Sequence, residues 1–393
     1  MIHRIKDEIW LNSRNALGWR SPRKIVVIAV DDYGNVRLAS REARKALDEA
    51  GLQVRSRLDL YDTLEDAADL GALYDVLTSV KDKNGRHAVF TPLALPMNID
   101  FEKIRAKQYD DFYNEPLTET FEKLPGYEGT WELWKQGMEA GIFLPQFHGR
   151  EHLNLKMFRH LLRQRDPELM ANLENRSYAS ISSRPFPNIN YPAAFHFEEF
   201  AENESLKEIL REGLETFEQV FGYRATLFNA PAGREHRVLH EELAHLGVRY
   251  IESSLLFKEH QGRGKYKTEL RYTGKKNEYG QTFLVRNVVF EPAQDRGLDW
   301  VDFALRQIAA AFRWRRPAQI SSHRVNFCGR IDEKNREKGL SGLKELLQRI
   351  VKTWPDVEFM AGNELGDFIA KPEYATGKTN GNKDNHNSKT HKQ

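Results

Sequence analysis

The chain of 393 residues carries 59 Lys and Arg against 57 Asp and Glu, a formal net charge of +2, and 40% of its residues are hydrophobic. This composition excludes an intrinsically disordered chain, and the interspersed charges give no basis for nucleic-acid binding. Cys328 is the only cysteine, which excludes an intramolecular disulfide and a multi-cysteine zinc site, so any metal site must use His, Asp or Glu.

Charged residues interrupt the apolar positions of residues 1–10, so we expect no export signal. The longest apolar runs, such as residues 25–30, are much shorter than the roughly 18 residues that a membrane-spanning helix needs. We therefore expect a cytoplasmic protein that does not insert into a membrane.

Short β-branched runs alternate with longer helical patterns, which is typical of βα units around a parallel sheet. Residues 25–30 are apolar throughout, as in a strand covered on both faces, and a helical pattern follows until Gly51. Further strands are predicted at residues 88–91, 142–147, 178–182, 225–228, 248–253, 282–289, 319–322 and 357–360. Helices are predicted at residues 41–50, 156–164, 205–221, 236–246, 300–312 and 342–353. These units are numerous enough for a barrel.

The alternation breaks down between residues 98 and 139, where acids, aromatics and prolines mix. We interpret this segment as an insertion over the barrel mouth. Residues 371–393 are polar and almost free of apolar side chains, so we expect a disordered tail. Residues 1–370 are then one α/β barrel domain.

Two adjacent carboxylates, Asp31 and Asp32, directly follow the first apolar strand, and Tyr33 and Gly34 come next. In βα barrels, catalytic groups project from the carboxyl ends of the strands. A carboxylate pair there offers one metal ligand and one general base. The alternative is that one of the two caps the next helix.

His148 and His152 follow another apolar run and lie four positions apart. On a helical turn this spacing places both imidazoles on one face, where they can bind one metal ion. His236 and His240 have the same spacing, with His245 further along, but no strand precedes them. We assign that second set to a solvated helix face.

His323 follows the predicted strand at residues 319–322. A single histidine of this kind is more often a hydrogen-bonded structural residue. An aspartate pair, a histidine pair and a late histidine at successive strand ends can, however, converge at one barrel mouth.

If they converge, Asp32, His148 and His152 bind a divalent ion that keeps open positions for water and a substrate carbonyl. Asp31 then takes the proton of the water, and a protonated His323 gives a proton to the leaving amine. The predicted reaction is hydrolysis of an amide or an ester.

These residues resemble the motifs of the polysaccharide deacetylase family (carbohydrate esterase family 4, NodB homology domain), whose fold is a distorted (β/α)7 barrel. The aspartate pair resembles the first motif with one residue inserted before the glycine, which implies that Asp31 is the base and Asp32 a metal ligand. His148 and His152 match the second motif, His-x-x-x-His, as the two other ligands. His323 matches the catalytic histidine of the last motif.

The third motif of the family, Arg-x-Pro, has Asn229 in place of the arginine, followed by Pro231. In the family that arginine orients the base aspartate. Either Arg286, Arg234 or Arg324 replaces it, or the chemistry is modified.

The remaining matches are looser. The family's Asp-x-x-Asp-Trp motif is matched by residues 295–300 with one extra residue in the spacing. Aromatic faces stack on sugar rings, although most aromatic residues belong to the core. Further substrate-binding candidates are Tyr33, Asn229, Pro231, Arg286, Trp131 and Trp134.

The resemblance implies a metal-dependent hydrolase that removes acetyl groups from an N- or O-acetylated sugar or polysaccharide. It implies one divalent metal ion, zinc in the first place, while cobalt and nickel also suit an Asp-His-His site. Two alternatives stay open: a hydrolase of another C–N bond on the same barrel, and a carbohydrate-binding barrel without catalysis, suggested by the missing arginine. The sequence leaves the oligomeric state open.

Overall fold

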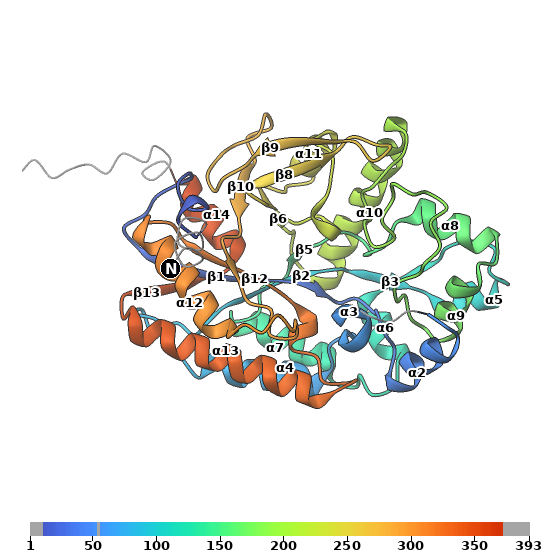
Figure 1. The fold of residues 1–393 in the computed structure, drawn as a ribbon, viewed down its shortest axis with the longest axis horizontal. Helices are drawn as coiled ribbons and strands as arrows, with labels where there is room; N and C mark the ends of the chain where they lie inside the picture. Colours follow the sequence, from blue (N-terminus) through green and yellow to red (C-terminus); the bar gives the residue numbers. More distant parts are fainter. Residues whose placement is uncertain (1–10, 53–55, 372–393) are drawn as a thin grey trace, which may run out of the picture.

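The computed structural model describes residues 11–52 and 56–371. A parallel sheet runs through the centre of the molecule, with helices packed around it (Figure 1). Within the described residues, its strand order is β10 (Thr282–Val285), β7 (Tyr250–Ser253), β6 (Leu227–Phe228), β5 (Gln146–Phe147), β2 (Phe90–Ala94), β1 (Lys24–Tyr33), β12 (Ala318–His323) and β11 (Val288–Val289), and β13 (Val357–Met360) pairs with β1.

The two ends of this sheet belong to one chain segment. Only Arg286 and Asn287 separate β10 from β11, yet β10 pairs with β7 while β11 pairs with β12. The sheet therefore closes on itself through residues 282–289 and has seven strand positions around the ring, with β13 as an addition beside β1. The predicted distorted (β/α)7 barrel is confirmed.

Strand β1 shows how the barrel is packed. Val26, Ile28 and Val30 belong to the large core between the sheet and the surrounding helices. Ile25 and Val27 point the other way and pack inside the barrel. The apolar run has no polar face because both of its faces are covered.

The helices and the remaining strands connect these strand positions. α4 and α13 lie along one side of the barrel, and the β8–β9 hairpin lies on the opposite side (Figure 1). The helices in chain order are α2 (Arg41–Glu49), α3 (Arg57–Tyr61), α4 (Ala67–Thr78), α5 (Phe101–Ala106), α6 (Leu117–Lys123), α7 (Thr130–Glu139), α8 (Leu155–Arg163), α9 (Pro167–Glu174), α10 (Asn203–Phe221), α11 (Val238–His245), α12 (Trp300–Arg313), α13 (Glu333–Thr353) and α14 (Gly362–Ala370). The additional strands are β3 (Met97–Ile99), β4 (Asn114–Pro116), β8 (Leu256–His260) and β9 (Tyr266–Leu270).

One predicted strand, residues 178–182, is wrong. Tyr178 and Ile181 are buried, but the segment has no strand partner, and the backbone N–H of Tyr178 donates to Arg37 instead. The other strands already occupy all seven positions of the closed sheet, so residues 178–182 pack against the barrel without forming strand-to-strand hydrogen bonds.

Helix α13 begins nine residues earlier than the sequence predicts. Gly339, inside it, marks a close approach, since a Cβ there would lie 1.7 Å from the carbonyl oxygen of Asn326. The glycine that lowers the helical signal is therefore required by packing.

The segment 98–139 is ordered, and it does not cover the mouth of the cavity described below. It continues the β3–β4 hairpin and ends in α7, which packs against α4 on the outside of the barrel. The predicted disordered tail lies outside the described residues from position 372 onward.

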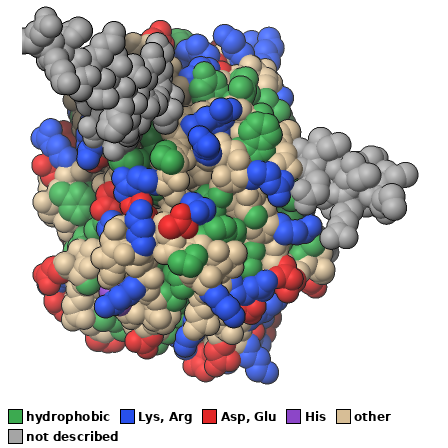
Figure 2. Space-filling model, turned by 90° about the vertical axis from the view of Figure 1, so that its left-hand side faces the viewer, with side chains coloured by type: hydrophobic (Ala, Val, Ile, Leu, Met, Phe, Trp, Pro, Cys, Tyr) green, Lys and Arg blue, Asp and Glu red, His purple; other side chains and the backbone are tan. Residues whose placement is uncertain are grey.

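None of the described helices is long and apolar enough to cross a bilayer. Basic and acidic side chains alternate on the face shown in Figure 2, with no extended area of one sign.

Candidate metal centre and active site

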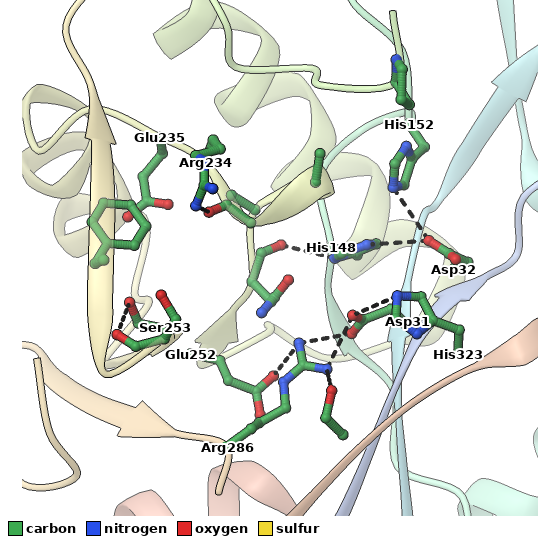
Figure 3. Close-up of a pocket in the computed structure, with 18 of the residues that line it drawn as sticks. Asp31, Asp32, His148, His152, Arg234, Glu235, Glu252, Ser253, Arg286 and His323 are labelled. Carbon is green, nitrogen blue, oxygen red and sulfur yellow. Dashed lines mark hydrogen bonds and ion pairs between the residues drawn. The ribbon is translucent and has the colours of Figure 1, made fainter. Parts of the chain in front are cut away.

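A cavity of about 490 Å³ opens at the carboxyl ends of the barrel strands (Figure 3). The alternation along the strands explains its polar lining. Apolar residues of β6, β7 and β10 pack inside the barrel: Leu227, Tyr250 and Leu284. The residues two positions further along each chain segment share their direction and line the cavity: Asn229, Glu252 and Arg286.

Asp32, His148 and His152, the three metal ligands predicted from the sequence, lie together in a group that could hold a metal ion. All three are buried, and one ligand atom of each lies within 4.8 Å of the others. His148 Nε2 lies 3.5 Å and His152 Nε2 3.3 Å from Asp32 Oδ1 (Figure 3). Two imidazoles and a carboxylate are ligands that zinc and related divalent metals accept.

The hydrogen bonding of His148 tests whether a metal ion fits this group. His148 Nδ1 donates to the carbonyl oxygen of Asn229 over 2.9 Å, which leaves Nε2 with a lone pair. This buried Nε2 has no hydrogen-bond partner among the described residues, although it faces the carboxylate of Asp32. Two buried acceptors that face each other are unfavourable, and a divalent cation satisfies both. The residues therefore fit a metal ion.

The turn after β1 aims the Asp32 carboxylate at the two histidines. Asp32 has a left-handed backbone with φ 79°, which departs from the alternation of the strand. Gly34 is also left-handed, and a Cβ there would lie 2.6 Å from the carbonyl oxygen of Leu95. Burial alone would raise the pKa of Asp32, but without a metal ion, protons on the facing Nε2 atoms of His148 and His152 hold this pKa well below its usual range. A divalent cation in the same position favours the ionised carboxylate in the same way.

Asp31 lies beside the ligand group, and Arg286 holds it by a two-point contact. Arg286 Nη1 donates to Asp31 Oδ2 over 3.0 Å, and Nη2 lies 2.9 Å from Oδ1. Arg286 also lies 3.2 Å from Glu252 Oε2 and donates to Ser321 Oγ over 3.0 Å. With its amide turned to suit both neighbours, Asn229 accepts from Arg286 Nη2 over 2.7 Å.

Of the three arginines that the sequence offers, Arg286 is therefore the one that contacts Asp31. Arg324 is buried and donates to Asp62 and Glu65 instead. Arg234 lies across the cavity from Asp32 (Figure 3). Arg286 belongs to residues 282–289, which close the barrel. This segment thus supplies a guanidinium group beside Asp31, where the sequence has Asn229 in place of the expected arginine.

His323 is the neighbour of Asp31 in the β1–β12 register, and its Nε2 lies 3.7 Å from Asp31 Oδ2. On its other side, His323 Nδ1 lies 2.5 Å from Glu291 Oε1. Arg57 and Asn326 both donate to Glu291 Oε2 over 2.7 Å. Burial would lower the pKa of His323, but Glu291 outweighs burial and raises it to about 9. The imidazole is therefore protonated at neutral pH.

Three predicted substrate-binding aromatics lie outside the cavity: Tyr33, Trp131 and Trp134. Trp134 is fully buried, and its ring centroid lies 4.9 Å from that of Phe143 and 5.4 Å from that of Phe221. Substrate contact by these three residues therefore finds no support in the structure. The tryptophans, three positions apart on α7, face the core between helices and sheet.

Of the other substrate-binding candidates, Asn229 and Arg286 line the cavity, whereas Pro231 is not among the lining residues. A Cβ on Gly149 would lie 3.0 Å from Pro231 Cγ, and Gly149 has φ 115°. Pro231 therefore packs directly against the turn that carries His148, and only glycine suits that turn.

The interpretation of the second histidine set as a solvated helix face was wrong for His236 and His240, although His245, at the end of α11, is exposed. His240 is 2% exposed, its Nε2 lies 3.3 Å from Glu235 Oε1, and Asn277 contacts its other ring nitrogen. His236 precedes α11 and packs against the ring of Phe197. The sequence pattern around these histidines looks solvent-exposed because it is charged, but one of its acids, Glu235, is buried and lines the cavity.

Sequence reasoning missed the acids that support the site. Glu252 and Glu291 each lie at or directly after an apolar run, and the inward alternation of those strands could have identified them. Residues 295–300, the loosely matched motif, instead lead into α12, where Asp299 caps the helix and Trp300 Nε1 donates to Gln294. Glu291, not Asp295, is the acid that contacts His323.

No protein-family model and no curated protein matches the chain. Solved structures similar to it include polysaccharide deacetylases and family 4 carbohydrate esterases at low sequence identity. A family 4 carbohydrate esterase from Streptomyces lividans in complex with acetate is 9% identical, over 87% of this chain and 95% of that chain, with a TM-score of 0.36. The peptidoglycan deacetylase PdaC from Bacillus subtilis is 10% identical, over 90% of this chain and 95% of that chain, with a TM-score of 0.35. PuuE allantoinase is 11% identical, over 91% of this chain and 94% of that chain, with a TM-score of 0.44.

Proposed function

We propose that the protein is a metal-dependent hydrolase that removes acetyl groups from an N- or O-acetylated sugar or polysaccharide. The observation that carries this proposal is the convergence of three potential metal ligands with a carboxylate and a protonated imidazole in one cavity. Such a set contains a metal site, a general base and a general acid, the components of metal-assisted hydrolysis.

Asp32, His148 and His152 would hold the ion, and zinc suits this donor set best, with cobalt and nickel as alternatives. When bound, a divalent ion supplies Lewis-acid polarisation of a water molecule and of the acetyl carbonyl. The Nδ1–H of His148, held by the carbonyl of Asn229, keeps Nε2 directed at the metal position.

Asp31 acts as the general base. It takes one proton from the attacking water as the water oxygen bonds to the acetyl carbon. Arg286 holds the Asp31 carboxylate by two contacts, so the base stays oriented during the transfer.

His323 acts as the general acid. The C–N or C–O bond of the acetyl group breaks as His323 gives its proton to the leaving amine or alcohol. Glu291 keeps His323 protonated at neutral pH by raising its pKa to about 9. The products are acetate and the free amine or hydroxyl group of the sugar.

The cavity wall suits a polyhydroxylated substrate. Across from the ligand group it carries the carboxylate of Glu235 and the hydroxyl of Ser253 (Figure 3). Ser254 and the ring of Phe257 also line the cavity. Carboxylates and hydroxyls bond sugar hydroxyl groups, and an aromatic ring packs on the apolar face of a sugar.

The experiment is elemental analysis of protein purified without a metal-affinity step, combined with an acetate-release assay on acetylated glycans. We expect about one divalent ion per chain and acetate release, both lost in Asp32→Ala and His152→Ala. Protein without metal, or variants with full activity, would refute the proposal. Thermal melting of each variant identifies any that fail to fold.

The same assay separates the two alternatives. Release of product from a panel of cyclic and linear amides, without acetate from glycans, indicates hydrolysis of another C–N bond. Glycan binding without turnover, unchanged in Asp31→Asn, indicates a barrel without catalysis. The contact of Arg286 with Asp31 supports catalysis, because it replaces the arginine whose absence suggested this alternative.

A further inference from the structure

A second hollow of about 460 Å³ adjoins the catalytic cavity, and we call it the side groove. Ala232 and Arg234 line both hollows, so the side groove lies directly beside the catalytic cavity. The polar and aromatic residues of the side groove are Arg184, Asn188, Asn190, His196, Arg234 and Tyr266. The proposed mechanism uses none of these residues.

The charged lining of the side groove is entirely cationic. Among the described residues that line it, none is an aspartate or glutamate. Arg234 Nη1 donates to the carbonyl of Gly233 over 3.3 Å, and Arg184 Nη1 donates to the carbonyls of Ile181 and Ser183. Neither guanidinium has a carboxylate partner within the described part of the chain. Two unpaired guanidinium groups in one groove favour an anionic ligand.

His196 adds a further donor to this wall. It is 6% exposed, its ring stacks on that of His260 with centroids 4.2 Å apart, and its Nδ1 accepts from the N–H of Asn190. Burial, followed by His260 and Arg234, lowers the pKa of His196 to about 3, so the ring is neutral and carries its proton on Nε2. This Nε2 has no acceptor among the described residues.

Tyr266 gives the groove an aromatic face. Its side chain is 44% exposed, although it packs by its edge against His260. The guanidinium of Arg234 lies 5.8 Å from the centre of this ring. An exposed aromatic ring beside a guanidinium is suited to a sugar ring with an anionic substituent.

We propose that the side groove binds the sugar unit next to the acetylated one and recognises a carboxylate or phosphate on that unit through Arg184 and Arg234. This inference rests on the proposed function, because it assumes that an acetylated sugar occupies the catalytic cavity. The substrate is then an acidic oligosaccharide or polysaccharide, and neutral acetylated glycans bind more weakly.

Binding is measured by calorimetry on the full chain stripped of metal with a chelator, so that no turnover interferes. The probes are three tetrasaccharides: one of N-acetylglucosamine alone, one that alternates hexuronate with N-acetylglucosamine, and one of N-acetylglucosamine with phosphate esters on alternate units. We expect one acidic probe to bind at least about tenfold more tightly than the neutral one. The probe that gains identifies carboxylate or phosphate as the recognised group.

Arg184→Gln and Arg234→Gln should each remove most of this preference, because each should weaken binding of the acidic probe by about tenfold and binding of the neutral probe far less. Arg263→Gln is the matched control, since Arg263 is on the adjacent hairpin turn but is paired with Glu199. Equal binding of all three probes, or a preference that survives both variants, overturns the inference. The lysine variants at positions 184 and 234 should retain part of the preference, which separates charge recognition from misfolding.

Acetate release by the metal-loaded protein is measured in parallel. A tenfold preference without acetate release supports the side groove and refutes the proposed function. Acetate release without any preference for acidic probes supports the proposed function and overturns the side groove as an anion site.

Discussion

The two ends of the barrel interior are built from the same strands but are filled in opposite ways. At the amino end, Ile25, Val27 and Leu284 belong to an apolar cluster with Leu365 and Ile369 of α14. At the carboxyl end, the inward positions further along these strands carry charged groups around an open cavity. The same alternation therefore places a packed core at one end and reactive groups at the other.

This contrast indicates that the amino end of the barrel stabilises the fold, whereas the carboxyl end carries the groups of the proposed active site. Buried charges cost desolvation free energy, so the carboxyl end contributes little to folding. The apolar amino end and the outer core must supply the stability that holds the charged groups in place. The predictions below test this separation, from the largest expected effect to the smallest.

Removing a metal ligand should have the largest effect on activity. We expect His148→Ala to lower acetate release by about 10³-fold or more and to remove the metal, with little change in the free energy of unfolding. The matched variant at the amino end, Leu284→Ala, should lose about 2–4 kcal/mol of stability by creating a cavity and should retain its metal. Urea unfolding and elemental analysis measure both. Loss of metal from folded Leu284→Ala would contradict the separation.

Replacing the arginine that orients the base should have the next largest effect. Arg286→Gln is expected to lower kcat/KM by about 10²-fold, because the Asp31 carboxylate loses its two-point contact. The metal content should stay the same, since Arg286 contacts no ligand side chain in the described structure. Arg286→Lys should recover only part of the rate, because an ammonium group cannot make the two parallel contacts. Full activity of Arg286→Gln would show that Asp31 needs no orientation.

Glu291→Gln should shift the pH dependence more than the maximal rate. The acid form of His323 is the active one, and its pKa of about 9 means that activity falls as the pH rises through about 9. Without the Glu291 carboxylate this pKa falls toward its ordinary value, so the basic limb of the pH–rate profile moves to lower pH. At pH 8 the variant should lose about tenfold or more. If the basic limb of the profile does not move, His323 is not the general acid whose pKa Glu291 raises.

Changes in the aromatic cluster on α7 should have the smallest effect on catalysis. Trp131→Phe and Trp134→Phe should each destabilise the chain by about 1–3 kcal/mol while KM stays unchanged, because neither ring lines the cavity. Michaelis constants on an acetylated glycan check this. A several-fold increase in KM in either variant would indicate that the tryptophan contacts the substrate.

The strand ends and the five proposed reactive residues could be predicted because the signal is local in the sequence. Asp31 and His323 each follow an apolar run at a fixed distance, and the spacing of His148 and His152 is readable without a structure. These patterns also predicted the barrel, which β1 and its neighbours confirm.

The supporting acids could not be predicted, and Arg286 could be predicted only as one of three candidate arginines, because these contacts depend on how distant segments meet. Arg286 reaches Asp31 only because residues 282–289 close the barrel between β7 and β12. Glu291 reaches His323 across the β11–β12 pairing. The buried Glu235 is contacted by His260 of the β8–β9 hairpin and by Arg271, and the sequence did not indicate this hairpin. The helical spacing of Trp131 and Trp134 does not distinguish a ring in the core from a ring in a cavity.

The most direct test of the central claim is anomalous diffraction at the zinc absorption edge from crystals of the zinc-loaded protein. We predict one strong peak per chain at about 2.0–2.2 Å from an oxygen of Asp32 and from the Nε2 atoms of His148 and His152. A peak elsewhere, or no peak among these three side chains, would contradict the account of the site as a metal centre.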